Sequence, residues 1–215
     1  MADTLNEIEV RVLGSLVEKQ LTTPEYYPLT LNALLAACNQ KSNRDPVVSY
    51  DEGVITHALD SLREKNLVYV FYGSTSRVVK YKHMLPGVFE LEADEVALMA
   101  VLMLRGAQTV GELKERTGRM HDFANLLEVQ ETLDRLTRRD DPLVVKLERQ
   151  AGQKDARYAH LLAGEPDVSA IPAPRPLPTS AGSGRIEALE AEVSALRSEV
   201  DTLKTMFDEF RKQFE

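Results

Sequence analysis

The sequence has few of the residues that build disulfide frameworks, metal sites and membrane spans. Its 215 residues include one cysteine, Cys38, which excludes an intrachain disulfide framework and a cysteine-rich zinc module. The four histidines are scattered, with no HxxxH or HExxH spacing for zinc. No apolar run approaches the ~18–20 residues needed to cross a bilayer. We therefore expect no metal, no cofactor and no membrane segment.

The residues also lack the motifs of common enzymes. There is no glycine-rich phosphate loop and no nucleophile elbow, and Cys38 has no flanking motif of a catalytic thiol. Cys38 follows an amphipathic segment, where a buried cysteine is common, so we expect it in the core. The first residues carry neither a basic nor an apolar region typical of a signal peptide. These features predict a cytoplasmic protein that is not an enzyme.

Charge is unevenly distributed along the chain. There are 26 basic and 34 acidic residues, a net charge of −8, and residues 165–215 alone carry 6 basic and 10 acidic residues. By contrast, residues 65–89 hold four basic residues and no acidic one. Nucleic-acid-binding domains usually present a basic surface, so the local excess matters more than the total.

A proline-rich segment divides the chain. Residues 163–184 contain five of the ten prolines and end in a glycine and serine cluster. Proline fixes φ and lacks the amide donor, so neither a helix nor a central strand continues through it. We predict a linker over 163–184.

A heptad pattern follows the linker. Apolar residues alternate at spacings of three and four, which is typical of a coiled coil, and Ile or Val at a with Leu at d favours two parallel strands. A helix that folds back on its own domains stays open as the alternative. The sequence predicts a coiled-coil helix over 185–215, with the dimer seam at Ile186, Leu189, Val193, Leu196, Val200, Leu203, Phe207 and Phe210, continued by Phe214.

The first 162 residues contain a weak internal repeat with a period near 80 residues, and each unit predicts three helices followed by a hairpin. Capping boxes at Ser49 and Thr109 are expected to begin a helix in each unit. Three helices and a two-stranded hairpin make the winged-helix arrangement. The predicted fold is mainly α with small β-hairpin wings (α+β), as two tandem winged-helix domains over 1–85 and 86–162 and a C-terminal coiled-coil helix.

Three segments carry a resemblance to a known family. They are EKQLTTPEYYPLTLN at 18–32, ACNQKSNRDP at 37–46 and LRGAQTVGEL at 104–113. Together they resemble the YceH family of uncharacterised bacterial proteins, over about residues 5–162. The resemblance implies a tandem winged-helix fold with a variable linker and a heptad tail. It implies no activity, ligand or catalytic residue.

The loop after the second predicted helix is a candidate binding site. Helix-turn-helix proteins approach the DNA backbone at this position, and amides and basic side chains bind phosphate oxygens or base edges. A loop whose amides satisfy its own backbone is the alternative. The candidates are Asn39, Gln40, Lys41, Asn43 and Arg44.

The first predicted hairpin is the second candidate site. Its basic residues are Arg77, Lys80 and Lys82, next to a tip of small residues, 74–76, that fits a minor groove. A solvated hairpin is the alternative. The preceding helix is acidic, which is unfavourable for a helix lying in a major groove.

Two functions therefore stay open for this chain. A dimeric DNA-binding protein of the transcription-regulator type, acting on double-stranded DNA, is favoured by the basic hairpins. A protein-interaction adaptor, which uses winged helices as docking surfaces as the acidic condensin-associated chromosome segregation proteins do, is favoured by the acidic third helix.

The unbroken heptad predicts that the protein is a homodimer through residues 186–214. A chain truncated after Ala163 should sediment as a monomer, and Leu196→Lys should weaken the dimer because it places a charge in the seam. The same oligomeric state with and without the tail would contradict this prediction.

Overall fold

The computed structural model describes residues 4–72, 78–149 and 155–166, and all of them fall within one compact unit. The coiled-coil residues and most of the predicted linker lie outside these ranges, as does Arg77. The predicted dimer seam is therefore not tested by the structure. The described part is helical with two small antiparallel sheets, so the predicted mixture of helix and hairpin is confirmed.

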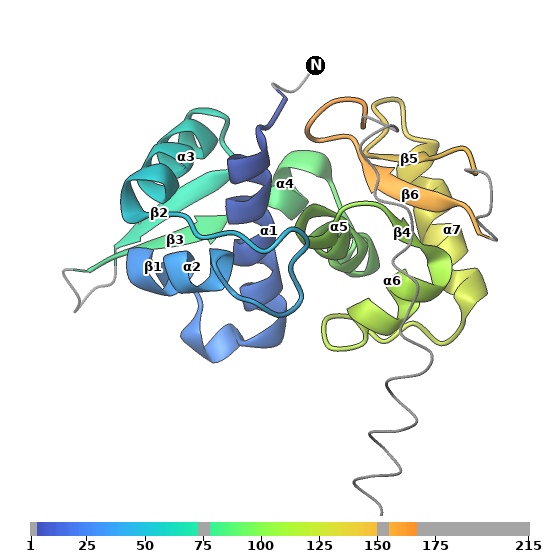
Figure 1. Ribbon diagram of the computed structural model, residues 1–215, viewed down its shortest axis with the longest axis horizontal. Coiled ribbons are helices and arrows are strands. Elements are labelled where there is room, and N and C mark those ends of the chain that lie inside the picture. Colours follow the sequence, from blue (N-terminus) through green and yellow to red (C-terminus); the bar gives the residue numbers. More distant parts are fainter. Residues whose placement is uncertain (1–3, 73–77, 150–154, 167–215) are drawn as a thin grey trace, which may run out of the picture. The chain divides into compact units, whose positions relative to one another are not determined.

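The first half runs helix, short strand, helix, helix and two strands, and ends in a short helix (Figure 1). Its elements are α1 (Glu7–Thr22), η1 (Pro24–Tyr26), β1 (Leu29–Thr30), α2 (Leu31–Cys38), α3 (Glu52–Glu64), β2 (Val68–Tyr72), β3 (Val79–His83) and α4 (Leu85–Phe89).

The second half has the same order of helices and strands, apart from η1 and α4. Its elements are α5 (Ala93–Arg105), β4 (Gln108–Thr109), α6 (Val110–Thr117), α7 (Leu126–Thr137), β5 (Val144–Lys146) and β6 (Arg157–His160). The weak repeat in the sequence thus corresponds to a repeat in element order. The strands β1 and β4 were not predicted, because two residues are too few to form a recognisable sequence pattern.

Each half contains a three-stranded antiparallel sheet. The strand orders are β1-β3-β2 and β4-β6-β5, so the hairpin's second strand lies in the centre of each. His83 pairs with Val68, and His160 pairs with Val144, at equivalent ends of the two hairpins. Burial lowers the pKa of both imidazoles to about 4. The two histidines therefore occupy equivalent positions in the two halves.

One of the two predicted capping boxes is correct. The Thr109 hydroxyl accepts from the Glu112 amide at 3.2 Å, and the Glu112 carboxylate accepts from the Thr109 amide at 2.9 Å. The prediction at Ser49 is wrong. Helix α3 is capped by Asp51, whose carboxylate accepts from the Val54 amide at 2.9 Å. An aspartate caps an N-terminus as well as serine does, and here it lies closer to the helix.

Helices α1 and α5 form the centre of the described unit, where they pack against each other (Figure 1). Residues 9–18 of α1 and 95–104 of α5 are buried on every side of the helix. Such all-round burial is typical of a central helix rather than of an amphipathic surface helix. For α5 the sequence contains the reason, because residues 96–104 are nine consecutive apolar residues.

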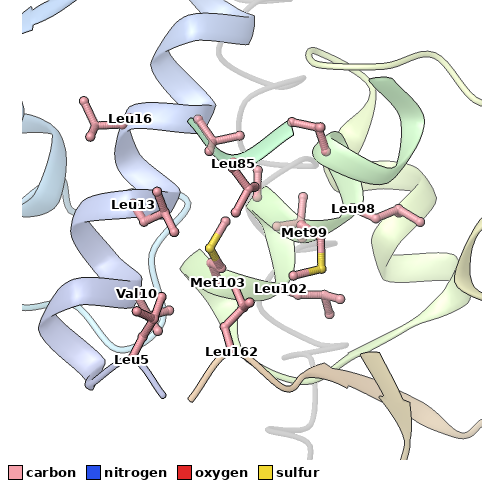
Figure 2. Packing of buried hydrophobic residues seen from close by; sticks show 14 of the residues in the cluster. Leu5, Val10, Leu13, Leu16, Leu85, Leu98, Met99, Leu102, Met103 and Leu162 are labelled. Atoms are coloured by element: carbon pink, nitrogen blue, oxygen red, sulfur yellow. The ribbon is translucent and has the colours of Figure 1, made fainter. Parts of the chain in front are cut away.

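Gly14 allows the two helices to approach closely. A Cβ atom at this position would lie 3.0 Å from the Met103 Cβ and 3.1 Å from the Leu104 side chain. Carbon atoms in good contact are about 3.5–4.0 Å apart, so a side chain here would separate the helices. Around this point Leu13 of α1 points toward Met103 of α5, whereas Leu16 lies on the other side of α1 (Figure 2). One continuous apolar core therefore serves both halves.

Candidate nucleic-acid interface

The loop between α2 and α3, residues 39–50, is closed by its own amide side chains. The Asn39 amide donates to the Tyr50 carbonyl oxygen, and the Tyr50 N–H donates to the Asn39 side-chain oxygen, both at 2.8 Å. The Gln40 side-chain oxygen accepts from the Lys19 ammonium of α1 at 3.0 Å. These bonds fix both the start and the end of the loop.

Arg44 is buried beneath this loop in a two-pronged ion pair. Its Nη1 and Nη2 lie 2.9 and 2.6 Å from the two carboxylate oxygens of Glu18. Its Nε and Nη2 also donate to the Ala37 carbonyl oxygen at the end of α2. Burial alone would raise the pKa of the Glu18 carboxyl, but the guanidinium outweighs burial and holds that pKa below its usual value. The arrangement joins α1, α2 and the loop.

The same loop contacts the carboxyl end of α5. The Asp45 amide donates to the Leu104 carbonyl oxygen at 3.0 Å, and the Arg105 guanidinium donates to the Asn43 side-chain oxygen at 2.9 Å. Carbonyl groups in the last turn of a helix have no partner within it, so Asp45 supplies one. Asn43 has a φ of 57°, a left-handed conformation that asparagine tolerates better than most residues. The loop therefore connects the two halves.

Four of the five loop candidates use their side chains inside the protein. Asn39, Gln40, Asn43 and Arg44 are engaged as described above, which favours the structural interpretation of this loop. Lys41 differs, because its side chain is exposed and has no hydrogen bond or ion pair with the described residues. It is the loop residue best placed to meet a partner.

The first hairpin presents aromatic and basic side chains on one face. In the register of β2 and β3, Tyr69 lies opposite Lys82 and Phe71 lies opposite Lys80. Directly paired residues share a face of an antiparallel sheet. Tyr69 is 61% exposed and Phe71 42%, and Lys82 is exposed with Lys80 half-buried. We call Tyr69, Phe71, Lys80 and Lys82 the outward hairpin face.

The opposite face of this hairpin packs on the core. Val68 and His83 are buried there, and Tyr81 is half-buried. Successive residues of a strand point to opposite faces, so the places of Tyr69 and Phe71 within Val68–Tyr72 are the sequence signal that could have found them. Sequence analysis predicted Lys80 and Lys82 but missed Tyr69 and Phe71, because aromatic residues in a strand are equally typical of a core.

The positive charge of the outward hairpin face has no nearby carboxylate along the chain. Residues 66–89 contain no Asp or Glu. Lys65, which contributed to the basic count in the sequence, is engaged elsewhere, because its ammonium lies 2.8 Å from the Glu9 carboxylate. Lys80 and Lys82 therefore supply the charge of the described hairpin, and Arg77 lies outside the described residues.

Helix α3 is acidic on its exposed surface. Glu52, Asp60 and Glu64 are exposed, whereas the Arg63 guanidinium is paired with Asp60 at 3.1 Å. A surface of this kind repels phosphates. The predicted conflict between a basic hairpin and an acidic third helix is therefore present in the structure.

The second hairpin is less suited to phosphate. Its Arg157 donates to the Glu112 carboxylate at 3.0 Å and to the Ala107 carbonyl oxygen at 2.8 Å. The Lys146 ammonium is exposed and lies 5.9 Å from the centroid of the Tyr158 ring. The charge of Arg157 is therefore used within its own half of the protein.

The thiol of Cys38 is poorly placed for covalent chemistry. Cys38 is fully buried, as predicted, and burial raises the pKa of its thiol to about 11, which suppresses the reactive thiolate. Within the described ranges no three metal-binding side chains gather into a cluster. Among the helices of those same ranges, none combines the length and apolarity that a bilayer crossing requires.

Comparison with known proteins gives a consistent result. The model of the family DUF480, described as a protein of unknown function, matches residues 5–153. A UPF0502 protein of Geotalea daltonii is 56% identical over 99% of both chains, and one of Geobacter sulfurreducens is 52% identical over 98% of both. A UPF0502 protein of Opitutus terrae is 59% identical over 81% of this chain and 76% of its own.

The buried ion pair predicts that Arg44 acts in stability. Arg44→Ala should lower the free energy of unfolding by about 3–5 kcal/mol, because it leaves the buried Glu18 carboxylate without its partner. Because the pKa of Glu18 is lower in the folded than in the unfolded chain, this contribution is complete at neutral pH. It is lost as the pH falls through the folded-state pKa, so wild type and variant should converge in acid.

Lys41→Ala in the same loop is the matched control and should change the free energy of unfolding by no more than about 0.5 kcal/mol. Urea unfolding at neutral and acid pH measures all three chains. Equal stability of Arg44→Ala and wild type at neutral pH would contradict this account of the loop.

Proposed function

The chain belongs to the DUF480 family, and we propose that this member is a non-enzymatic, dimeric DNA-binding protein of the transcription-regulator type. It has two tandem winged-helix domains, over residues 1–85 and 86–162. A linker over 163–184 joins them to a coiled coil over 185–215, which pairs two copies and brings two first hairpins to one DNA molecule.

The order of elements supports the winged-helix proposal. Each half runs helix, short strand, helix, helix and hairpin, with the short strand added to the hairpin as a third strand. In this arrangement α3 and α7 are the third helices, and β2–β3 and β5–β6 are the wings. The two units share the core between α1 and α5 and belong to one compact unit.

The outward hairpin face is the observation that carries the DNA-binding proposal. Lys80 and Lys82 extend from a rigid sheet, and residues 66–89 add no carboxylate to oppose them. Lys41, exposed in the α2–α3 loop, is a further candidate phosphate contact in the proposal, as is Arg77, which lies outside the described residues. Lysines bind phosphate as point charges without reading sequence. We therefore propose that the first wing binds the duplex backbone.

The acidic helix α3 limits how the duplex is bound. Glu52, Asp60 and Glu64 would meet phosphates if α3 entered a major groove. The wing therefore leads the interaction, and α3 faces away from the duplex. Affinity in this mode is dominated by phosphate contacts, so it is weakly dependent on sequence and strongly dependent on salt.

An adaptor function is the second candidate, and two exposed leucines favour it. Leu126 and Leu127, at the start of α7, are 54% and 65% exposed. Together with the acidic surface of α3 they provide apolar and negatively charged contacts suited to a protein partner. Retention of a partner protein from lysate after nuclease treatment would favour this function over DNA binding.

The DNA-binding proposal predicts the effect of removing two charges from the wing. Lys80→Ala with Lys82→Ala should weaken binding to duplexes of unrelated sequence about equally. The slope of log affinity against log salt should fall in magnitude by roughly two, one for each lost phosphate contact. Fluorescence anisotropy over a salt series measures both quantities.

Lys114→Ala with Arg119→Ala is the matched control, because it changes the net charge equally on α6 and the turn after it. This control should keep nearly the wild-type slope. Failure of the wild-type protein to bind a duplex at ~50 mM salt would overturn the proposal in favour of the adaptor function.

A further inference from the structure

Two aromatic rings on the outward hairpin face have no role in the core. Tyr69 and Phe71 are 61% and 42% exposed, although Val68 and Val70, which alternate with them in the strand, are buried and half-buried. Their cross-strand partners are Lys82 and Lys80. Duplex phosphates would be held by the lysines alone, so the proposed DNA contact leaves the rings unexplained.

We propose that the outward hairpin face binds single-stranded nucleic acid, with unpaired bases stacked on Tyr69 and Phe71 and phosphates held by Lys80 and Lys82. The inference deepens the proposed nucleic-acid-binding function and rests on the same face. Aromatic platforms combined with a positive surface are the recurring chemistry of single-strand binding, and they tolerate any base because every base has a flat face.

The spacing of the two rings suits stacked bases. Residues two apart in a strand are separated by roughly 6.6–6.8 Å along it. Stacked bases are separated by about 3.4 Å, so the strand places the two rings at twice that repeat. One unpaired base can therefore enter between the rings, or one base can stack on each. Bases inside a duplex are covered by their neighbours and cannot do either.

The surroundings of the face also suit a single strand. The exposed carboxylates of α3 belong to the same half of the protein, so a rigid duplex can bind this face only with α3 turned away from its phosphates. A flexible single strand can follow the hairpin alone.

Fluorescence anisotropy with the full chain tests the proposal with two labelled probes. One is a 20-nucleotide oligo(dT), which cannot pair with itself, and the other is a blunt 20-base-pair duplex. Tyr69→Ala and Phe71→Ala should each weaken oligo(dT) binding by about fivefold to a hundredfold, with the salt slope unchanged. Lys80→Ala and Lys82→Ala should instead lower that slope.

Tyr72→Ala is the matched control. Tyr72 lies in the same strand and is 72% exposed, but it pairs with Val79 on the opposite face. It should bind oligo(dT) as wild type does. A loss equal to that of Tyr69→Ala would overturn the assignment of the face. All three side chains are exposed, and circular dichroism checks that the variants fold.

Stacking itself has a direct signal in this chain, which contains no tryptophan. Phe71→Trp introduces a single indole on the proposed platform, and oligo(dT) should quench its fluorescence by stacking. Tyr72→Trp places the indole on the other face and should show little quenching. Equal fluorescence of Phe71→Trp with and without saturating oligo(dT) would overturn the stacking proposal.

The two probes separate this inference from the proposed function. Duplex binding that depends on Lys80 and Lys82, with weaker oligo(dT) binding that ignores both rings, would overturn the inference and leave the DNA-binding proposal intact. Ring-dependent oligo(dT) binding without duplex binding would overturn the duplex-binding proposal and support the inference. Binding to neither probe would overturn both.

Discussion

The packing of α1 against α5 is the contact on which the rest of the described structure depends. Both helices are buried on all sides, and Gly14 lets them approach until its backbone meets Met103 and Leu104. Neither half has a complete core without the central helix of the other. The two repeated units are therefore not independently packed domains, because both are built around one shared pair of helices.

Most polar residues of the α2–α3 loop are used inside the protein. Arg44 holds the loop to Glu18 within its own half, and Asp45 and Asn43 connect it to the end of α5 in the other half. The first hairpin takes no part in that connection. It leaves Tyr69, Phe71 and Lys82 exposed and Lys80 half-buried, which makes it the surface available to a partner.

Local features were predictable from the sequence, and long-range partners were not. The Thr109 capping box and both hairpins follow from neighbouring residues, and their predictions are confirmed. The cap at Ser49 was wrong because α3 begins at Glu52, where Asp51 is the capping residue. Arg44 was predicted as a surface candidate because its partner Glu18 lies 26 positions away, beyond any local pattern. The apolar run of α5 indicates a buried central helix, but no local pattern indicates that α1 is the helix it packs against.

Native-state hydrogen exchange tests most directly whether the two halves are one cooperative unit. The amides of Leu59 in α3 and Leu133 in α7 lie in different halves and are both buried. They should exchange with one shared opening free energy, and Gly14→Leu, which overpacks the α1–α5 contact, should lower it for both by the same amount, about 1–3 kcal/mol. Separate opening free energies, or a loss confined to one half, would contradict a shared core.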